Sequence, residues 1–344
     1  MPLAFSASDR NNSDGILPID VRSGGLYGAR VSGIGLVFNP RAGRNRKDPD
    51  AHVRLARQLG DHGVVAAPRS LDELSRVAED FHRLHIDVLG IAGGDGTNHV
   101  TLTGFRDVYG EDPLPTVALL RGGTMNTVAN SLGLPNERTE GLLDRIVTRY
   151  LESPVVPTVR QFTIDVEGKL AFLWGLGVVP AFLDEYYSSG VPSPWQAAKT
   201  LARGIGSTLV HGAMVRRITT PVHVEISTAD GVLWPMQPYF SVAAGTIEDI
   251  GLGFKPFFRA HERPGAFHLL GIDTTPAGFV VEIPRIHRAK PMAPQKYVDA
   301  LVAHIVVRAR ESTMRYMIDG DIVVHPRDRM VLRTGPAVRI ATLH

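Results

Sequence analysis

A glycine-rich run directly after an apolar segment constrains this chain more than any other feature. The apolar run Ile86–Ala92 predicts a buried strand. The residues that follow it are Gly93, Gly94, Asp95, Gly96 and Thr97. Three glycines remove side chains that would keep a ligand away, so successive backbone N–H groups can converge on phosphate oxygens near a helix N-terminus. A tight strand-to-helix turn without a ligand is the alternative.

Two further polar turns follow neighbouring predicted strands. One comes after the strand Gly33–Phe38 and the other after the strand Thr116–Leu120. Their candidate ligand-binding residues are Asn39 and Arg44 in the first turn, and Gly122, Gly123, Thr124 and Asn126 in the second. Ligands of open α/β sheets bind outside the carboxyl ends of strands, so we expect the three turns to lie side by side and form one phosphate-binding edge. Arg46 and Lys47, which follow the first turn, equally fit a solvated face.

The first half of the chain alternates short β-branched runs with amphipathic stretches, between residues 31 and 150. Asp48 followed by Pro49 predicts the start of one helix. Ser70 with Glu73 three residues later predicts a capping box at the start of another. Strands that are apolar on both faces and alternate with helices predict a Rossmann-like α/β domain with a parallel sheet covered on both sides.

The second half is rich in short β-type segments bounded by Gly, Pro and Asp, which predict an antiparallel sandwich or barrel. These segments are Gln161–Val166, Leu170–Leu176, Val222–Ser227, Tyr239–Ala243, Phe267–Ile272, Val302–Arg308 and Arg315–Ile318. One predicted helix, about Trp195–Arg217, interrupts them.

The composition of the 344 residues excludes several classes of function. The chain has no cysteine, which excludes a disulfide framework, a thiolate metal site and a cysteine nucleophile. Lys and Arg number 37 against 35 Asp and Glu, and this balance argues against nucleic acid as a partner. The longest uncharged apolar stretch, Leu170–Leu183, is shorter than the roughly 18 residues of a transmembrane segment. Residues 1–30 are polar, and we expect a flexible extension without a secretory signal.

A late motif, Asp319-Gly320-Asp321, places two carboxylates around a glycine after a predicted strand. By itself, Asp-Gly predicts a hairpin turn. Its position at the end of an ordered series of four motifs suggests a functional role in addition to the turn. In chain order, the series is Asn39-Pro40 with Gly43, then residues 93–97, then Gly123-Thr124-Met125-Asn126, and finally residues 319–321.

The ordered series resembles the diacylglycerol kinase catalytic-domain superfamily, which includes bacterial lipid kinases, sphingosine kinases and ceramide kinases. The resemblance implies an N-terminal α/β nucleotide-binding domain and a C-terminal antiparallel β-sandwich, as in NAD kinases and diacylglycerol kinases. The implied boundaries are residues 31–155, joined by a returning segment of about 326–344, for the first domain and residues 156–325 for the second.

The same resemblance implies an ATP-dependent phosphotransferase that acts on a hydroxyl of a membrane lipid such as diacylglycerol. The glycine loops would hold the ATP phosphates, with Asn39 and Arg44 nearby. Asp319 would accept the hydroxyl proton, and Asp95 would help to organise the nucleotide and Mg²⁺, whose ligands stay unassigned. We expect a cytoplasmic protein that docks peripherally at the inner membrane face. A homodimer is one open alternative for its oligomeric state.

Three acidic positions of the family are altered here. Val100 and Thr127 stand where the family often has Glu and Asp, and the late Glu is the shorter Asp321. Two alternatives therefore stay open: a weak or inactive nucleotide-binding regulatory member of the same fold, and a kinase for a soluble acceptor, as in NAD kinases.

Overall fold

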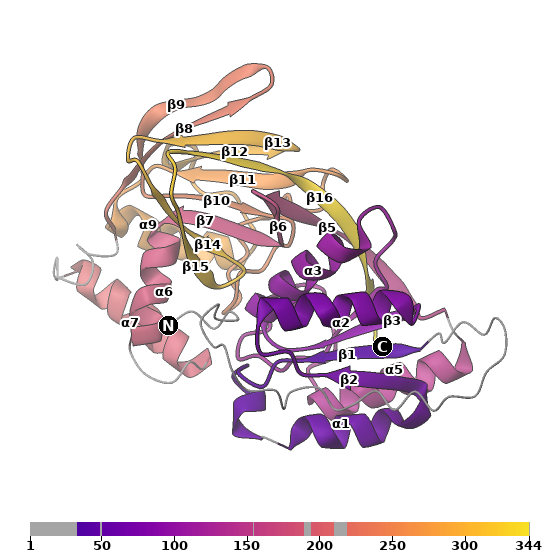
Figure 1. The fold of residues 1–344 in the computed structure, drawn as a ribbon. Coiled ribbons are helices and arrows are strands. Elements are labelled where there is room, and N and C mark those ends of the chain that lie inside the picture. Colours follow the sequence, from indigo (N-terminus) through magenta and orange to yellow (C-terminus); the bar gives the residue numbers. More distant parts are fainter. Residues whose placement is uncertain (1–32, 49, 154, 189–193, 210–218, 344) are drawn as a thin grey trace. The chain divides into compact units, whose positions relative to one another are not determined.

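The computed structural model describes residues 33–48, 50–153, 155–188, 194–209 and 219–343 (Figure 1). The extension predicted for residues 1–30 lies outside these ranges. The described residues form two compact units. Residues 33–129, 133–161 and 338–343 make up the α/β unit, and residues 130–132 and 162–337 make up the β unit.

The α/β unit contains a parallel sheet in the order β2-β1-β3-β4-β16. Its strands are β1 (Ile34–Phe38), β2 (Gly63–Ala66), β3 (Val88–Ala92), β4 (Thr116–Leu119) and the last residues of β16 (Arg329–Ala341). Its helices are α1 (Ala51–Leu59), α2 (Leu71–Arg83), α3 (Asp95–Tyr109), α4 (Thr127–Ser131) and α5 (Thr139–Glu152), with short 3₁₀ turns η1 (Asn45–Lys47) and η2 (Gly60–His62). The predicted parallel α/β domain is confirmed.

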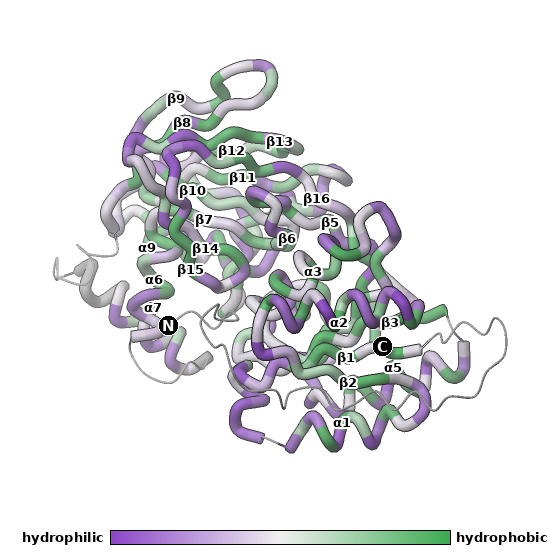
Figure 2. The backbone as a smooth tube through the Cα atoms, in the orientation of Figure 1, coloured by the Kyte–Doolittle hydropathy of each residue, from purple (hydrophilic) through white to green (hydrophobic). Residues whose placement is uncertain are grey.

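Helices cover both faces of this sheet, which explains why its central strands are apolar throughout. On one face, Leu36 of β1 packs in a core with Leu55 of α1 and Ile146 of α5. On the other face, Gly35 leaves room for the ring of Phe81 from α2, because a Cβ at residue 35 would lie 2.4 Å from that ring. Figure 2 shows hydrophobic colour along β1 and β3, whereas both colours alternate along α1 and α2.

The two predicted helix starts have different outcomes. At α2, the Ser70 hydroxyl accepts a hydrogen bond from Glu73 N at 3.2 Å, which is one half of the predicted capping box. The Glu73 carboxylate accepts from Arg69 N at 2.7 Å, one residue before the N-cap. At α1, Asp50 rather than Asp48 occupies the N-cap position. The Asp48 carboxylate is instead paired with the guanidinium of Arg54, and the N-cap lies two residues later than predicted from the sequence.

The β unit contains two antiparallel sheets. One has the order β16-β13-β8-β9, with β5 and β6 attached, and the other has the order β12-β11-β10-β7-β14-β15. The strands of the first sheet, besides β16, are β5 (Thr158–Val166), β6 (Lys169–Ala171), β8 (Val222–Thr228), β9 (Gly231–Tyr239) and β13 (His304–Ala309). Those of the second are β7 (Leu173–Gly177), β10 (Ser241–Gly245), β11 (Phe267–Ile272), β12 (Tyr297–Val302), β14 (Met314–Ile318) and β15 (Asp321–His325).

The two sheets share one apolar core, to which Trp174 of β7 and Ile226 of β8 both belong. The predicted antiparallel architecture is therefore confirmed. The unit also carries α6 (Val178–Ser188), α7 (Pro194–Leu209), α9 (Pro276–His287) and the 3₁₀ turn η3 (Pro294–Lys296). Helix α7 corresponds to the helix predicted for about Trp195–Arg217, of which residues 210–217 lie outside the described ranges. Within those ranges, no helix is long and apolar enough to cross a membrane.

Candidate functional site

The three polar turns of the α/β unit lie side by side, as the strand order requires. The turn after β1 contacts the turn after β4 through Arg44 N, which donates to Gly122 O at 3.0 Å. The turn after β4 contacts the turn after β3 through Gly123 N, which donates to Gly93 O at 2.9 Å. The prediction that the turns form one edge is confirmed, while phosphate binding by that edge stays a prediction.

The glycines in these turns allow the loops to approach one another closely. A Cβ on Gly123 would lie 2.3 Å from the Cα of Gly94, and a Cβ on Gly122 would lie 2.9 Å from the backbone N of Gly93. A Cβ on Gly43 would lie 2.3 Å from the hydroxyl of Thr124. Backbone atoms cannot move aside as a flexible side chain can. At residues 122 and 123, packing against backbone alone therefore requires glycine, whether or not a ligand binds.

Two buried asparagines connect the loops to the strand ends. The Asn39 side chain donates to the Thr97 hydroxyl at 2.8 Å and accepts from Arg41 N at 2.9 Å. The Asn45 amide donates to the carbonyls of Asn39 and Ala92, both at 2.8 Å. Asn45 was not among the predicted site residues. It lies between two arginines in the sequence, a context typical of solvent-exposed turns.

Asp95 lies at the start of α3, and its carboxylate faces the first turn of α4. One oxygen accepts from Thr127 N at 2.9 Å and the other from Val128 N at 3.1 Å. Burial raises the pKa of Asp95, although these hydrogen bonds oppose the shift. Through its two hydrogen bonds, Asp95 connects the glycine loop to α4, independently of any ligand. Gly96 follows Asp95 in the first turn of α3.

Two arginines bring positive charge to the loops. Arg121 is buried, at 3% exposed, and its guanidinium donates to Leu134 O at 2.6 Å. Burial and then the charge of Arg44 lower the pKa of Arg121, whereas Asp95 raises it. The remaining predicted ligand, Asn126, is buried and exchanges hydrogen bonds of 3.1 Å with Gly123 N and O in its own turn.

The Asp319 motif forms the hairpin turn between β14 and β15 in the β unit. Ile318 pairs with Asp321, so Asp319 and Gly320 are the two loop residues, with φ of 43° and 88°. Positive φ at both positions is the geometry of a type I′ hairpin turn. This result agrees with the hairpin interpretation, which was the simpler of the two.

Backbone N–H groups hold the carboxylate of Asp319, a residue that is only 2% exposed. Phe172 N lies 3.0 and 3.1 Å from the two carboxylate oxygens, and Leu173 N lies 2.8 Å from one of them. Asp321 is also buried, at 7% exposed. The turn therefore presents two buried acidic residues, one with its orientation fixed by the β6–β7 connection.

The loop-bearing region is similar to known diacylglycerol kinases. Residues 33–155 match the family model of the diacylglycerol kinase catalytic domain. Over 136 residues the chain is 24% identical to the diacylglycerol kinase of Bacillus subtilis (strain 168), a match that covers 39% of this chain and 44% of that protein. The aligned part thus spans less than half of the curated relative.

Solved structures extend the similarity in fold to almost the whole chain. A diacylglycerol kinase from Bacillus anthracis str. Sterne superimposes with a TM-score of 0.59 at 16% identity, covering 90% of this chain and 96% of the other. A second structure from that strain has a TM-score of 0.64 at 15% identity, with the same coverage. The resemblance inferred from the motifs is confirmed, and the match to the catalytic-domain model covers the first three of the four.

A metal site made by the protein alone does not fit the residues of the diacylglycerol kinase-like region. Both Asp95 oxygens already accept backbone hydrogen bonds, and Thr127 supplies no carboxylate beside them. Within the described residues, no cluster of three or more His, Asp or Glu could hold a metal ion.

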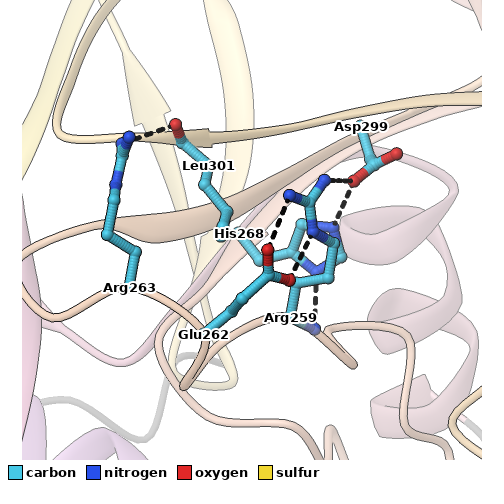
Figure 3. Close-up of polar contacts among 6 residues, drawn as sticks. All are labelled: Arg259, Glu262, Arg263, His268, Asp299 and Leu301. Atoms are coloured by element: carbon cyan, nitrogen blue, oxygen red, sulfur yellow. Dashed lines mark hydrogen bonds and ion pairs between the residues drawn. The ribbon is translucent and has the colours of Figure 1, made fainter.

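A second cluster anchors the long loop between β10 and β11 to the sheet (Figure 3). Arg259 binds Asp299 of β12 at 2.5 Å and Glu262 at 2.8 Å. His268 is fully buried, its Nε2 lies 3.2 Å from Asp299, and its Nδ1 accepts from Arg259 N at 3.4 Å. Burial lowers the pKa of His268. Arg263 adds a hydrogen bond of 2.6 Å to Leu301 O.

Proposed function

We propose that this protein is an ATP-dependent lipid kinase that transfers the γ-phosphate to a hydroxyl of a membrane lipid such as diacylglycerol. The observation that carries the proposal is the single edge formed by three glycine and asparagine turns at the carboxyl ends of β1, β3 and β4. The match of residues 33–155 to the diacylglycerol kinase catalytic domain supports it.

The charges at this edge favour a polyphosphate. Burial is the main cause of the lowered pKa of Arg121, and repulsion by the charge of Arg44 adds to it. An anion bound near both would relieve that repulsion, and a triphosphate supplies several negative charges. The predicted phosphate-binding residues at the edge are Asn39, Arg44, Gly93, Gly94, Asp95, Gly96, Thr97, Gly122, Gly123, Thr124 and Asn126. Asp95 would act there indirectly, by fixing α4 against the glycine loop.

Asp319 is the proposed general base. The acceptor hydroxyl would lose its proton to the Asp319 carboxylate while its oxygen bonds to the γ-phosphorus, and the bond from that phosphorus to the β–γ bridging oxygen would break to release ADP. Phosphoryl transfer depends mainly on positioning and charge stabilisation, so an ordinary carboxylate suffices. Mg²⁺ commonly reaches such sites bound to nucleotide phosphates and water, and no step here depends on protein ligands to it.

The acceptor and the location belong to the same proposal. A lipid acceptor requires the protein to reach a membrane surface, so we place it in the cytoplasm with peripheral docking at the inner membrane face. A homodimer stays a prediction. The competing functions, a soluble-acceptor kinase and an inactive nucleotide-binding protein, are outcomes of the test that follows.

The test measures transfer of label from γ-labelled ATP with Mg²⁺ to vesicles that contain diacylglycerol or other hydroxyl-bearing lipids, and in parallel to NAD. Asp319→Asn is compared with Asp230→Asn, which changes an exposed aspartate in the β8–β9 turn of the same unit. General-base catalysis contributes roughly 10²–10⁴-fold. We therefore expect lipid labelling to fall by that factor in Asp319→Asn and to persist in Asp230→Asn.

Two results would overturn the proposal. Labelled NAD with unlabelled lipid would establish a soluble acceptor. Binding of ATP without transfer to any acceptor would favour the regulatory alternative, in which the positions Val100, Thr127 and Asp321 no longer support catalysis.

A further inference from the structure

Helix α6 is bound to the β14–β15 hairpin at two points. Asp184 and Tyr187 are three residues apart, so they lie on the same face of α6. Asp184 pairs with both terminal nitrogens of Arg315 on β14, each at 2.5 Å. The Tyr187 hydroxyl donates to Gly320 O at 2.8 Å. One bond therefore reaches the strand before the turn, and the other reaches the turn itself.

The carbonyl that Tyr187 binds belongs to the most adaptable residue of the turn. Gly320, with φ of 88°, lacks a Cβ and therefore has more backbone conformations open to it than any residue with a side chain. Asp319, with φ of 43°, is a non-glycine residue in the left-handed region, as a type I′ turn requires at this position. The Tyr187 hydrogen bond to Gly320 O selects one orientation of the peptide group that joins Gly320 to Asp321.

Other contacts hold the partners of the Asp319 carboxylate in place. Leu173 pairs with Gly245 of β10, and Thr246 N, directly after that strand, donates to Phe172 O at 3.0 Å. The backbone of Asp319 also contacts this segment, through Asp319 N, which donates to Leu173 O at 3.1 Å. The two N–H groups that bind the carboxylate are therefore fixed by neighbouring strands. The hairpin turn must present the carboxylate to them at the correct angle, and Tyr187 is the side chain that reaches the turn from α6.

We propose that Tyr187 is a positioning residue: through Gly320 O it holds the Asp319 carboxylate in the orientation that accepts hydrogen bonds from Phe172 N and Leu173 N. The catalytic consequence rests on the function proposed above, in which Asp319 accepts the proton of the acceptor hydroxyl. The orientation itself is independent of that function.

The experiment compares Tyr187→Phe with Tyr297→Phe in the full chain. The second variant removes a phenolic hydroxyl from β12, which strands β11, β10 and β7 separate from β14. Hydrogen exchange is measured at the amides of Phe172 and Leu173. Asp319→Gly provides the reference for loss of the carboxylate, since glycine tolerates the positive φ at this position.

We expect exchange at both amides to rise about fivefold in Tyr187→Phe, in the direction of Asp319→Gly, because the net contribution of one hydrogen bond corresponds to about that factor. Tyr297→Phe should leave both amides unchanged. In the kinase assay, Tyr187→Phe should lower kcat about fivefold with little change in KM for ATP, since the bond positions the base and not the nucleotide.

Unchanged exchange at Phe172 and Leu173 in Tyr187→Phe would overturn the proposal, as would a raised KM for ATP with kcat unaltered. If the native chain labels no acceptor, the lipid kinase function fails, and the exchange measurement still decides whether Tyr187 orients the carboxylate. The two failures are therefore distinguishable.

Discussion

The glycine loops of the α/β unit and the Asp319 turn of the β unit are stabilised in opposite ways. In the loops, backbone packs against backbone, and asparagine side chains form hydrogen bonds with loop carbonyls. In the turn, the backbone of another connection binds a single side chain. Substitutions in the loops should therefore reduce stability together with ligand binding, whereas a conservative substitution at Asp319 should reduce activity alone.

The largest expected effect on stability belongs to Gly123→Ala. A Cβ at this position would lie 2.3 Å from the Cα of Gly94, so two loop backbones must separate. Overpacking of this kind costs about 3 kcal/mol. Chemical denaturation measures the change in the free energy of unfolding. Gly141→Ala in α5 is the control, since its Cβ would meet only side-chain atoms of Glu137, at 3.1 Å or more. Equal stability of the two variants would contradict the packing argument.

Asn45→Ala tests the asparagine contribution to the same loops. The substitution leaves the carbonyls of Asn39 and Ala92 without the amide that now donates to both. Each carbonyl keeps a backbone donor, Ala42 N for Asn39 and Asn39 N for Ala92, so the cost is the net value of two hydrogen bonds, about 2 kcal/mol. Thermal and denaturant unfolding measure the loss, with Asn136→Ala, at an exposed position of the same unit, as the control. A loss no greater than in the control would show that the loops hold together without Asn45.

In the β unit, His268 should make the stability of the fold depend on pH. Burial lowers the pKa of His268 in the folded state, and the positive charge of Arg259 lowers it further. The negative charges of Asp299 and Glu262 oppose this shift without reversing it. In the unfolded state the imidazole has a pKa of about 6.5, so it binds a proton more readily there than in the folded state. The free energy of unfolding is therefore full above that pH, and it declines below that pH by up to about 1.4 kcal/mol per pH unit. We expect His268→Gln to lose stability less steeply between pH 7 and pH 5. Parallel pH curves for the two proteins would refute this.

The smallest effect is expected for Asp319→Asn, whose free energy of unfolding should stay within about 1 kcal/mol of the native value. The amide oxygen of asparagine can still accept from Phe172 N and Leu173 N, and asparagine tolerates positive φ better than most residues. Denaturation of the same preparation used for the kinase assay gives the comparison. A loss as large as that of Gly123→Ala would remove the contrast between the two regions.

The sequence predicted those parts of the fold that depend on local signals. Glycine turns after apolar runs predicted the adjacent loops, because parallel strands bring their carboxyl ends to one edge. Strand β2, a half-buried strand at the edge of the sheet, was not predicted. Helix α9 was also not predicted, although Thr275 before Pro276 is a recognisable start, with the Thr275 hydroxyl accepting from Gly278 N.

The candidate site was predicted less completely, because its decisive contacts join distant residues. Asp319 and Phe172 are 147 positions apart, and no periodicity links an acidic turn to the amides that bind it. Asn45 was missed because its role depends on the ends of two different strands. The phosphate-binding role assigned to the loop residues and the catalytic role assigned to Asp319 are still predictions.

The strand β16 has a consequence for how the chain is made. Its first residues pair with β13, and Ile340 near its end pairs with Val117 of β4, far earlier in the chain. The parallel sheet of the α/β unit thus acquires its last strand only after the ribosome has synthesised the whole β unit. Pairing across such a separation slows folding. During synthesis, the edge of β4 stays open to other chains, so expression at low temperature or with chaperones should raise the soluble yield.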